Sequence, residues 1–111
     1  MEHTTRQSGK VTVIELSGEI DVSCAPQLKE LLLGLLDAGK NQLLIGLTGV
    51  SFMDSTALGI FANAFKRAQR AGGDIKFTNP REELRRVFSI TQTDKLFSIF
   101  DSVDEGLDSF Q

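Results

Sequence analysis

The sequence predicts an α/β fold, with a central, mostly parallel sheet of about four to five strands and about four helices packed on it. Two observations favour this class. Short apolar runs alternate along the chain with segments whose apolar residues recur at helical spacing. In addition, residues 43–47 are apolar without interruption, which is typical of a parallel strand covered on both faces. With 111 residues and no proline- or serine-rich linker, we expect residues 1–111 to form a single domain.

The first third of the chain predicts two strands and a helix. Residues 3–8 are expected to form a short edge strand, and residues 11–16 a half-buried strand that begins with alternating apolar and polar side chains. Pro26 falls in the first turn of the next helix, where its missing N–H costs little, and Gly39 is expected to cap the end of that helix. The apolar face of this helix comprises Leu28, Leu31, Leu32, Leu35 and Leu36.

The central stretch joins the buried strand at residues 43–47 to the helix that follows it. A connector is expected at residues 48–53, and the helix is expected to stop at Gly72-Gly73. Asp54 is a natural N-cap, which leaves Ser55 at the first helical position beside unpaired backbone N–H groups. The apolar stripe of this helix comprises Leu58, Phe61, Ala62, Phe65 and Ala68.

The last third predicts two more strands and two more helices. Residues 74–78 are expected to form a short strand, followed by a helix start in which Asn79 is the cap and Pro80 holds the first position. Residues 95–100 are expected to form the last strand. A capping-box pattern that begins at Ser102 predicts a closing helix.

The composition narrows the classes of partner. A net charge of −3 argues against nucleic acid as the direct partner. No apolar stretch approaches the ~18 residues of a membrane span, so no membrane association is expected. The single cysteine, Cys24, excludes an internal disulfide framework and leaves no Cys/His set for zinc. We therefore expect a cytoplasmic protein that needs neither a metal nor a cofactor.

The junction between the central strand and its helix is the strongest candidate site. A helix N-terminus carries roughly half a positive charge and free N–H donors, so it stabilises an exposed anion by about 0.3–1 kcal/mol. A phosphate on Ser55 would be favourably placed there. Taken alone, however, an aspartate followed by a serine at such a junction is also an ordinary helix cap.

Catalysis by the chain itself is not expected. A nucleophilic Ser55 would need a base, and the only histidine, His3, lies near the chain end, where structure frays. Neither a G-x-S-x-G pattern nor a G-x-x-x-x-G-K-[ST] loop is present. Glu19 and Asp21 would approach Asp54 if both connectors lie at one end of the sheet. Such acids could hold a metal ion or be solvated loop residues, and we favour the second interpretation.

Two segments of the chain resemble a known family. Gly18-Glu19-Ile20-Asp21 follows the second strand, and Ser51-Phe52-Met53-Asp54-Ser55-Thr56-Ala57-Leu58-Gly59 joins the central strand to its helix. Together they resemble the STAS domain of bacterial anti-sigma factor antagonists, and the likeness extends over nearly the whole chain. Three further features fit this family as well: the helix start at Ala25-Pro26, the break at Gly72-Gly73 and the segment Leu84-Arg85-Arg86-Val87-Phe88.

The resemblance implies a binding module of a partner-switching system that controls transcription, for example in a stress response. In this family the serine directly after the aspartate, here Ser55, is phosphorylated by a partner that is both a serine kinase and an anti-sigma factor. A PP2C-type phosphatase would reverse the modification. The unphosphorylated protein would bind the kinase and release the sigma factor. The residues implied in partner binding are Glu19, Asp21, Ser23, Met53, Asp54, Thr56 and Gly59.

Two positions depart from the family pattern. Ala57 stands where many members have glycine, but alanine favours a helix, so the phosphorylation site is still expected. Ile90-Thr91-Gln92-Thr93 replaces a Thr-Gly-Leu-like ending of the third helix, which leaves the identity of the partner open.

Two alternatives remain. A response-regulator receiver would be phosphorylated on Asp54. Glu19 and Asp21 would then correspond to the acids that such a domain carries after an early strand, and Lys95 to the lysine near its end. Against this, such domains carry their acid pair directly after the first strand, whereas Gly18 and Ile20 interrupt the pattern here. The second alternative keeps the fold but assigns the chain to a STAS scaffold or transport-system subunit that is not necessarily phosphorylated.

Overall fold

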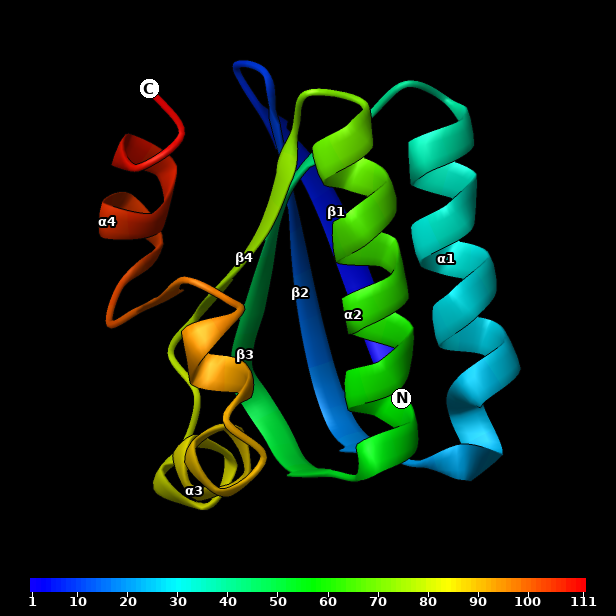
Figure 1. Cartoon of the computed structure of the whole chain (residues 1–111), viewed down its shortest axis with the longest axis vertical. Helices are drawn as coiled ribbons and strands as arrows, with labels where there is room; N and C mark the ends of the chain where they lie inside the picture. Colours follow the sequence, from blue (N-terminus) through cyan, green and yellow to red (C-terminus); the bar gives the residue numbers. More distant parts are fainter.

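A computed structural model describes all residues, 1–111, and contains one five-stranded sheet in the order β1-β2-β3-β4-β5 (Figure 1). β1 runs antiparallel to β2, and all other neighbouring strands are parallel, as the sequence predicted. The elements are β1 (Glu2–Ser8), β2 (Val11–Ile20), the 3-10 turn η1 (Val22–Cys24), α1 (Ala25–Asp37), β3 (Gln42–Met53), α2 (Ser55–Arg70), β4 (Asp74–Thr78), α3 (Glu82–Ile90), the 3-10 turn η2 (Thr93–Lys95), β5 (Ile99–Phe100) and α4 (Val103–Asp108).

Helices cover both faces of the sheet, with α1 and α2 side by side on one face and α4 on the other (Figure 1). The main core of 23 buried residues includes most of the predicted apolar faces of α1 and α2, whereas Leu31, Leu35 and Ala62 are only partly buried and pack against it. Phe77 on β4 lies at its centre and packs edge-on against Phe61 and Phe97, with ring centroids 5.0 and 4.9 Å apart. A smaller cluster beneath α4 contains Val11, Val13 and Leu44.

Glycines end both long helices, as predicted. Gly39 and Gly72 adopt positive φ angles of 82° and 84°, which residues with a Cβ rarely adopt. The following amide then reaches back to a carbonyl of the last turn: Gly73 N donates to Ala68 O at 2.8 Å. This is the Schellman arrangement, and it turns the chain from α2 towards β4.

The central strands are longer than predicted. β2 continues to Ile20 and β3 to Met53, so the expected connector at residues 48–53 is wrong and is the end of β3. Two irregularities in the β2–β3 register, on either side of the pair Ser17–Gly49, allow pairing to continue. Because each bulge shifts the alternation of side chains, the strand ends lack a period-two pattern in the sequence.

The third helix begins later than predicted. Its N-cap is Arg81, not Asn79, and Pro80 is buried before the first turn. Asn79 has a left-handed φ of 57°, and its amide donates to Phe100 O at 2.9 Å. The backbone of Asn79 therefore closes the sheet edge and is not available to start a helix.

The last strand is much shorter than the predicted span of residues 95–100. Only Ile99–Phe100 pair with β4, and Lys95 ends the turn η2. Phe97 is buried against Phe65, with ring centroids 5.4 Å apart. The backbone amides of Leu96 and Phe97 donate to Thr93 O, at 3.0 and 2.8 Å, so the chain turns here instead of extending along β4.

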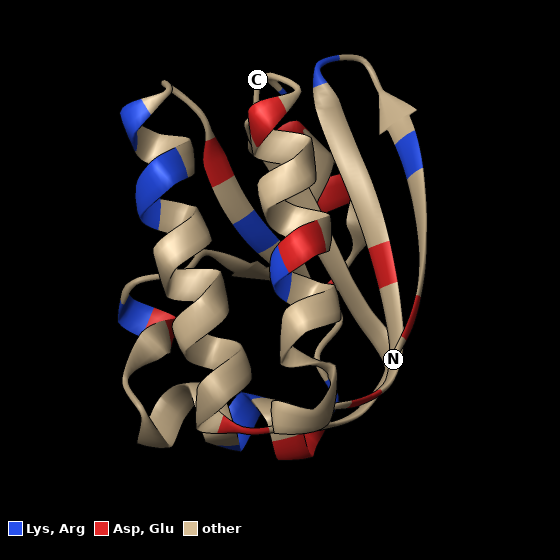
Figure 2. Cartoon of the chain, turned by 90° about the vertical axis from the view of Figure 1, so that its right-hand side faces the viewer, with Lys and Arg blue, Asp and Glu red and all other residues tan.

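Basic residues gather at the C-terminal end of α2. Figure 2 shows basic residues along the last turns of α2, and acidic residues near the base of the same helix and of α1. The basic residues are Lys66, Arg67 and Arg70, and Arg67 forms an ion pair with Asp37 of α1. None of the helices is both long enough and apolar enough to cross a membrane.

Candidate functional site

The carboxyl ends of β2 and β3 bring together two segments that are more than thirty residues apart in the sequence. Asp54 N, at the end of β3, donates to Ile20 O at 3.2 Å. In return, Val22 N, in the loop after β2, donates to Asp54 Oδ2 at 3.1 Å. Carboxyl ends of parallel strands are where ligands of α/β folds gather. The two segments therefore form one surface at this end of the sheet.

Asp54 caps α2, as the sequence predicted. Its backbone is extended, and its Oδ1 accepts a hydrogen bond from Ala57 N at 3.0 Å. Because Oδ2 accepts from Val22, each carboxylate oxygen is already engaged by a backbone amide. The side chain thus holds the first turn of α2 and the loop after β2 in a fixed relation.

Ser55 is the first residue of α2, also as predicted, and its side chain is exposed. The serine hydroxyl forms no hydrogen bond within the chain, and it stands beside N–H groups that lack intrahelical partners. Thr56 is exposed next to it. A hydroxyl that is accessible, uncommitted and at the positive end of a helix suits transfer of a phosphoryl group from a partner enzyme.

Asp21 and Ser23 shape the loop between β2 and α1. Asp21 caps η1 and accepts hydrogen bonds from both the hydroxyl and the amide of Ser23. These bonds lower the pKa of Asp21 below its ordinary value, because they stabilise the ionised carboxylate. The loop therefore carries a fixed negative charge close to Asp54.

The remaining predicted contact residues differ in their exposure. Glu19 is exposed and lies opposite Phe52 in the β2–β3 register. Gly59 is exposed on α2, with open space where a Cβ would lie. Met53, by contrast, is only 2% exposed and belongs to the core, so its side chain is not available on the surface. Glu19, Asp21 and Asp54 do not form a cluster that could hold a metal ion.

Two exposed apolar side chains lie in the segments expected to contact a partner, residues 18–23 and 51–56, but were not among the individually named partner-binding residues. Val22 is 67% exposed in the loop after β2, and Phe52 is 48% exposed near the end of β3. The exposure of Val22 could have been predicted from the sequence, since it is an apolar residue between polar ones in the loop. The exposure of Phe52 could not have been predicted, because only the bulged register turns Phe52 outward while Met53 turns inward. We call Glu19, Val22, Phe52 and Ser55 the switch surface.

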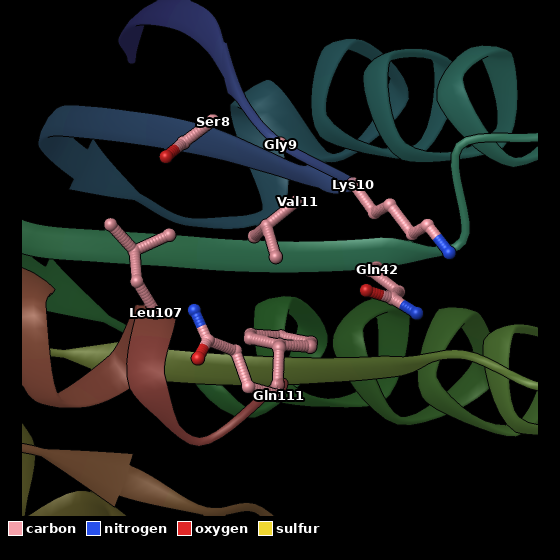
Figure 3. A pocket seen from close by; sticks show the side chains of 8 residues that line it. Ser8, Gly9, Lys10, Val11, Gln42, Leu107 and Gln111 are labelled. Carbon is pink, nitrogen blue, oxygen red and sulfur yellow. The ribbon is translucent and has the colours of Figure 1, made fainter.

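The largest cavity lies elsewhere, at the opposite end of the sheet. It has a volume of about 510 Å³ and lies between the β1–β2 turn and the end of the chain (Figure 3). Lys10 is its only charged side chain. The lining residues are Ser8, Gly9, Lys10, Val11, Gln42, Leu107, Phe110 and Gln111. None of the predicted site residues contributes to it.

The sequence matches relatives over most of its length. The family model of the STAS domain matches residues 2–106. The anti-sigma-B factor antagonist of Bacillus subtilis (strain 168) is 40% identical over 94 residues, which cover 85% of each chain.

Solved structures share the same architecture. An anti-sigma factor antagonist from Mycobacterium paratuberculosis superposes with a TM-score of 0.88 at 26% identity, over 98% of this chain and 92% of the other. The phosphorylated form of SpoIIAA, a cell fate determinant of Bacillus, gives a TM-score of 0.76 at 20% identity, over 99% of this chain and 100% of the other. The second likeness concerns the fold alone. From the family match and the close relative, this chain belongs to the STAS domain family.

Proposed function

We propose that this protein is an anti-sigma factor antagonist controlled by phosphorylation of Ser55. The unphosphorylated protein binds an anti-sigma factor that is also a serine kinase, and so releases the sigma factor. The kinase phosphorylates Ser55 and the complex dissociates, and a PP2C-type phosphatase restores the binding form. The protein acts in the cytoplasm, where transcription takes place, as a binding partner and not as an enzyme.

One observation carries this proposal: an exposed, uncommitted serine hydroxyl stands at the N-terminus of α2, within a STAS domain 40% identical to an anti-sigma-B factor antagonist. Asp54, the acceptor in the receiver alternative, is less suitable. Both of its oxygens accept backbone N–H groups, and phosphorylation there would break the helix cap and the link to Val22. The acid cluster that a receiver needs is also not formed.

The switch surface has the composition of a protein-binding site. Val22 and Phe52 supply exposed apolar area, and carboxylates border it at Glu19 and Asp21. Interfaces commonly combine an apolar centre with a polar rim, and aromatic side chains contribute strongly to affinity. Ser55 belongs to the same surface, so we expect a partner that covers Phe52 and Val22 to cover its hydroxyl as well.

Phosphorylation would act as an electrostatic switch at this surface. A phosphate adds about −1.5 to −2 charges at neutral pH, next to Asp54 and the carboxylates of the loop. Within the domain, the N-terminus of α2 offsets part of this charge. Against a partner surface fitted to a hydroxyl, however, the phosphate must be desolvated without compensation. Binding is therefore weakened while the fold is retained.

The test is in vitro phosphorylation with the kinase that co-purifies from the native organism, using labelled ATP. We expect one phosphate per chain, lost in Ser55→Ala and retained in the matched control Thr56→Ala. The bond should withstand hydroxylamine, which cleaves the acyl phosphate of a receiver. Labelling of Ser55→Ala at the wild-type level would overturn the assignment. Recovery of a transporter or scaffold complex, and of no kinase, would support the scaffold alternative.

A further inference from the structure

The two edges of the sheet are very different. β5, at one edge, is only two residues long. β1, at the other edge, has seven residues, of which Glu2 to Gln7 are all exposed. In Figure 2, β1 runs along the right-hand margin of the molecule, with no element beyond it. Long edge strands present unpaired N–H and C=O groups, and proteins usually protect them with bulges, prolines or a covering element. β1 has neither a proline nor a bulge.

We propose that β1 pairs antiparallel with β1 of a second copy of this chain, so that one sheet continues through a two-fold symmetric dimer. A second copy is the chemically suitable occupant because the strand is complementary to itself. The strand carries one acidic residue, Glu2, and one arginine, Arg6. They lie two residues before and two residues after Thr4, so the two opposite charges project from the same face of the strand. This inference does not depend on the proposed function.

Symmetry restricts the possible registers. Along an edge strand, the N–H and C=O groups of alternate residues point outward, so two opposed residues must both be outward-pointing or both inward-pointing. In a two-fold pair the partner is an identical strand, so the numbers of two opposed residues are both odd or both even. The midpoint between them is then itself a residue, and that residue lies opposite its own copy. The register is therefore centred on a residue and never between two residues. The candidates are centred on His3, Thr4, Thr5 or Arg6.

Charge selects the register centred on Thr4. There Glu2 of each copy lies opposite Arg6 of the other, on the same face of the sheet, and the pair occurs twice by symmetry. Opposite charges directly across an antiparallel pair stabilise it, whereas like charges destabilise it. Centring on Arg6 places the two guanidinium groups opposite each other. Centring on Thr5 leaves Glu2 and Arg6 opposite the neutral residues Ser8 and Thr4. Centring on His3 places Glu2 opposite Thr4 and moves Arg6 past Met1 of the other copy.

The dimer leaves the switch surface free. Because the β1 strands are antiparallel, the carboxyl ends of β2 and β3 point in opposite directions in the two copies. The two Ser55 hydroxyls therefore lie at opposite ends of the assembly. Dimerisation and partner binding are then independent, and a Ser55→Asp variant should self-associate like the wild type.

Sedimentation velocity tests the pairing and its charge selection. Over ~10 μM to ~1 mM, where an interface below the standard size associates, we expect a concentration-dependent dimer. Glu2→Arg and Arg6→Glu should each weaken self-association at least ~5-fold, because each creates two like-charge pairs. The double variant, Glu2→Arg with Arg6→Glu, restores the pairs and should restore the dimer. A monomer across this range, or single variants that dimerise like the wild type, would overturn the proposal.

Disulfide trapping tests the register independently. In a Cys24→Ala background, Thr4→Cys places its own copy directly opposite, at a Cα separation of about 4.5–5.5 Å that a disulfide can bridge. Thr5→Cys is the control, since in this register it faces His3 and lies too far from its own copy. We expect oxidation to cross-link the first variant and not the second. Faster cross-linking of Thr5→Cys would exclude the register centred on Thr4.

Discussion

Asp54 performs two structural tasks with one carboxylate, since Oδ1 caps α2 and Oδ2 holds the amide of Val22. Asp54→Ala removes both bonds, so we expect the free energy of unfolding to fall by about 1–3 kcal/mol in urea titrations. Asp54→Asn keeps one acceptor oxygen and should retain the cap. Its loss should be smaller, and faster hydrogen exchange should be seen at Val22. Equal effects of the two substitutions would show that the cap bond from Ala57 N contributes nothing.

Ser55 is the residue at which charge is expected to control binding. Ser55→Asp places a carboxylate beside Asp54, so we expect affinity for the kinase to fall at least ~10-fold, about 1.4 kcal/mol. Ser55→Ala should bind like the unmodified protein. Calorimetric titration with ADP present measures both, and circular dichroism checks that each variant is folded. Equal affinities of the folded Asp and Ala variants would mean that charge at this helix start is not the switch.

At the scale of single elements, the end of α2 depends on two adjacent glycines for different reasons. A Cβ at Gly73 would lie 1.9 Å from Asn41 O, whereas at Gly72 it meets nothing within 4 Å. Gly72→Ala should therefore cost only the left-handed strain, about 1–2 kcal/mol. Gly73→Ala must move the backbone between α1 and β3, so it should cost more, at least about 3 kcal/mol. Denaturant unfolding of the two variants compares them directly, and the reverse order would contradict the packing argument.

The turn η1 gives the stability of the protein an acid dependence. Hydrogen bonds from Ser23 lower the pKa of Asp21 below 3.8, so the native state favours the ionised form. This contribution is present above pH 3.8 and is lost as pH falls through the lowered native pKa. Ser23→Ala should therefore be less stable than the wild type near neutral pH, and the difference should shrink below pH 3.8. If the difference in unfolding free energy between the wild type and Ser23→Ala stayed constant with pH, the effect of Ser23 on stability would not depend on the ionisation of Asp21.

For the molecule as a whole, partner contact is expected at one end of the sheet only. The two segments that bear the switch surface, the end of β2 with its loop and the end of β3 with the start of α2, meet there. The cavity near Lys10 and Phe110 lies at the other end. Hydrogen exchange with and without the kinase should show protection at residues 18–23 and 51–60, and no change in the β1–β2 turn or α4. Protection confined to residues 81–110 would place the interface on α3 and its neighbours instead.

Features that depend on neighbours along the chain could be predicted from the sequence. The alternation of strands and helices, the glycine that ends each long helix, and Asp54 capping a helix that begins at Ser55 all follow from local periodicity and local hydrogen bonding. These preferences act within one or two turns, so the order of residues is sufficient. The family resemblance was confirmed by the match over residues 2–106.

Only the tertiary structure decided which side chains are exposed at the surface and which are buried. The bulged pairing of β2 with β3 exposes Phe52 and buries Met53, and Phe97 lies in a turn and packs against Phe65 of α2 instead of pairing with β4. The backbone of Asn79 closes the sheet edge and thereby delays the start of α3. Each outcome depends on register or packing between segments distant in the sequence. Local propensity cannot rank such contacts, because their free energies arise only when the segments are brought together.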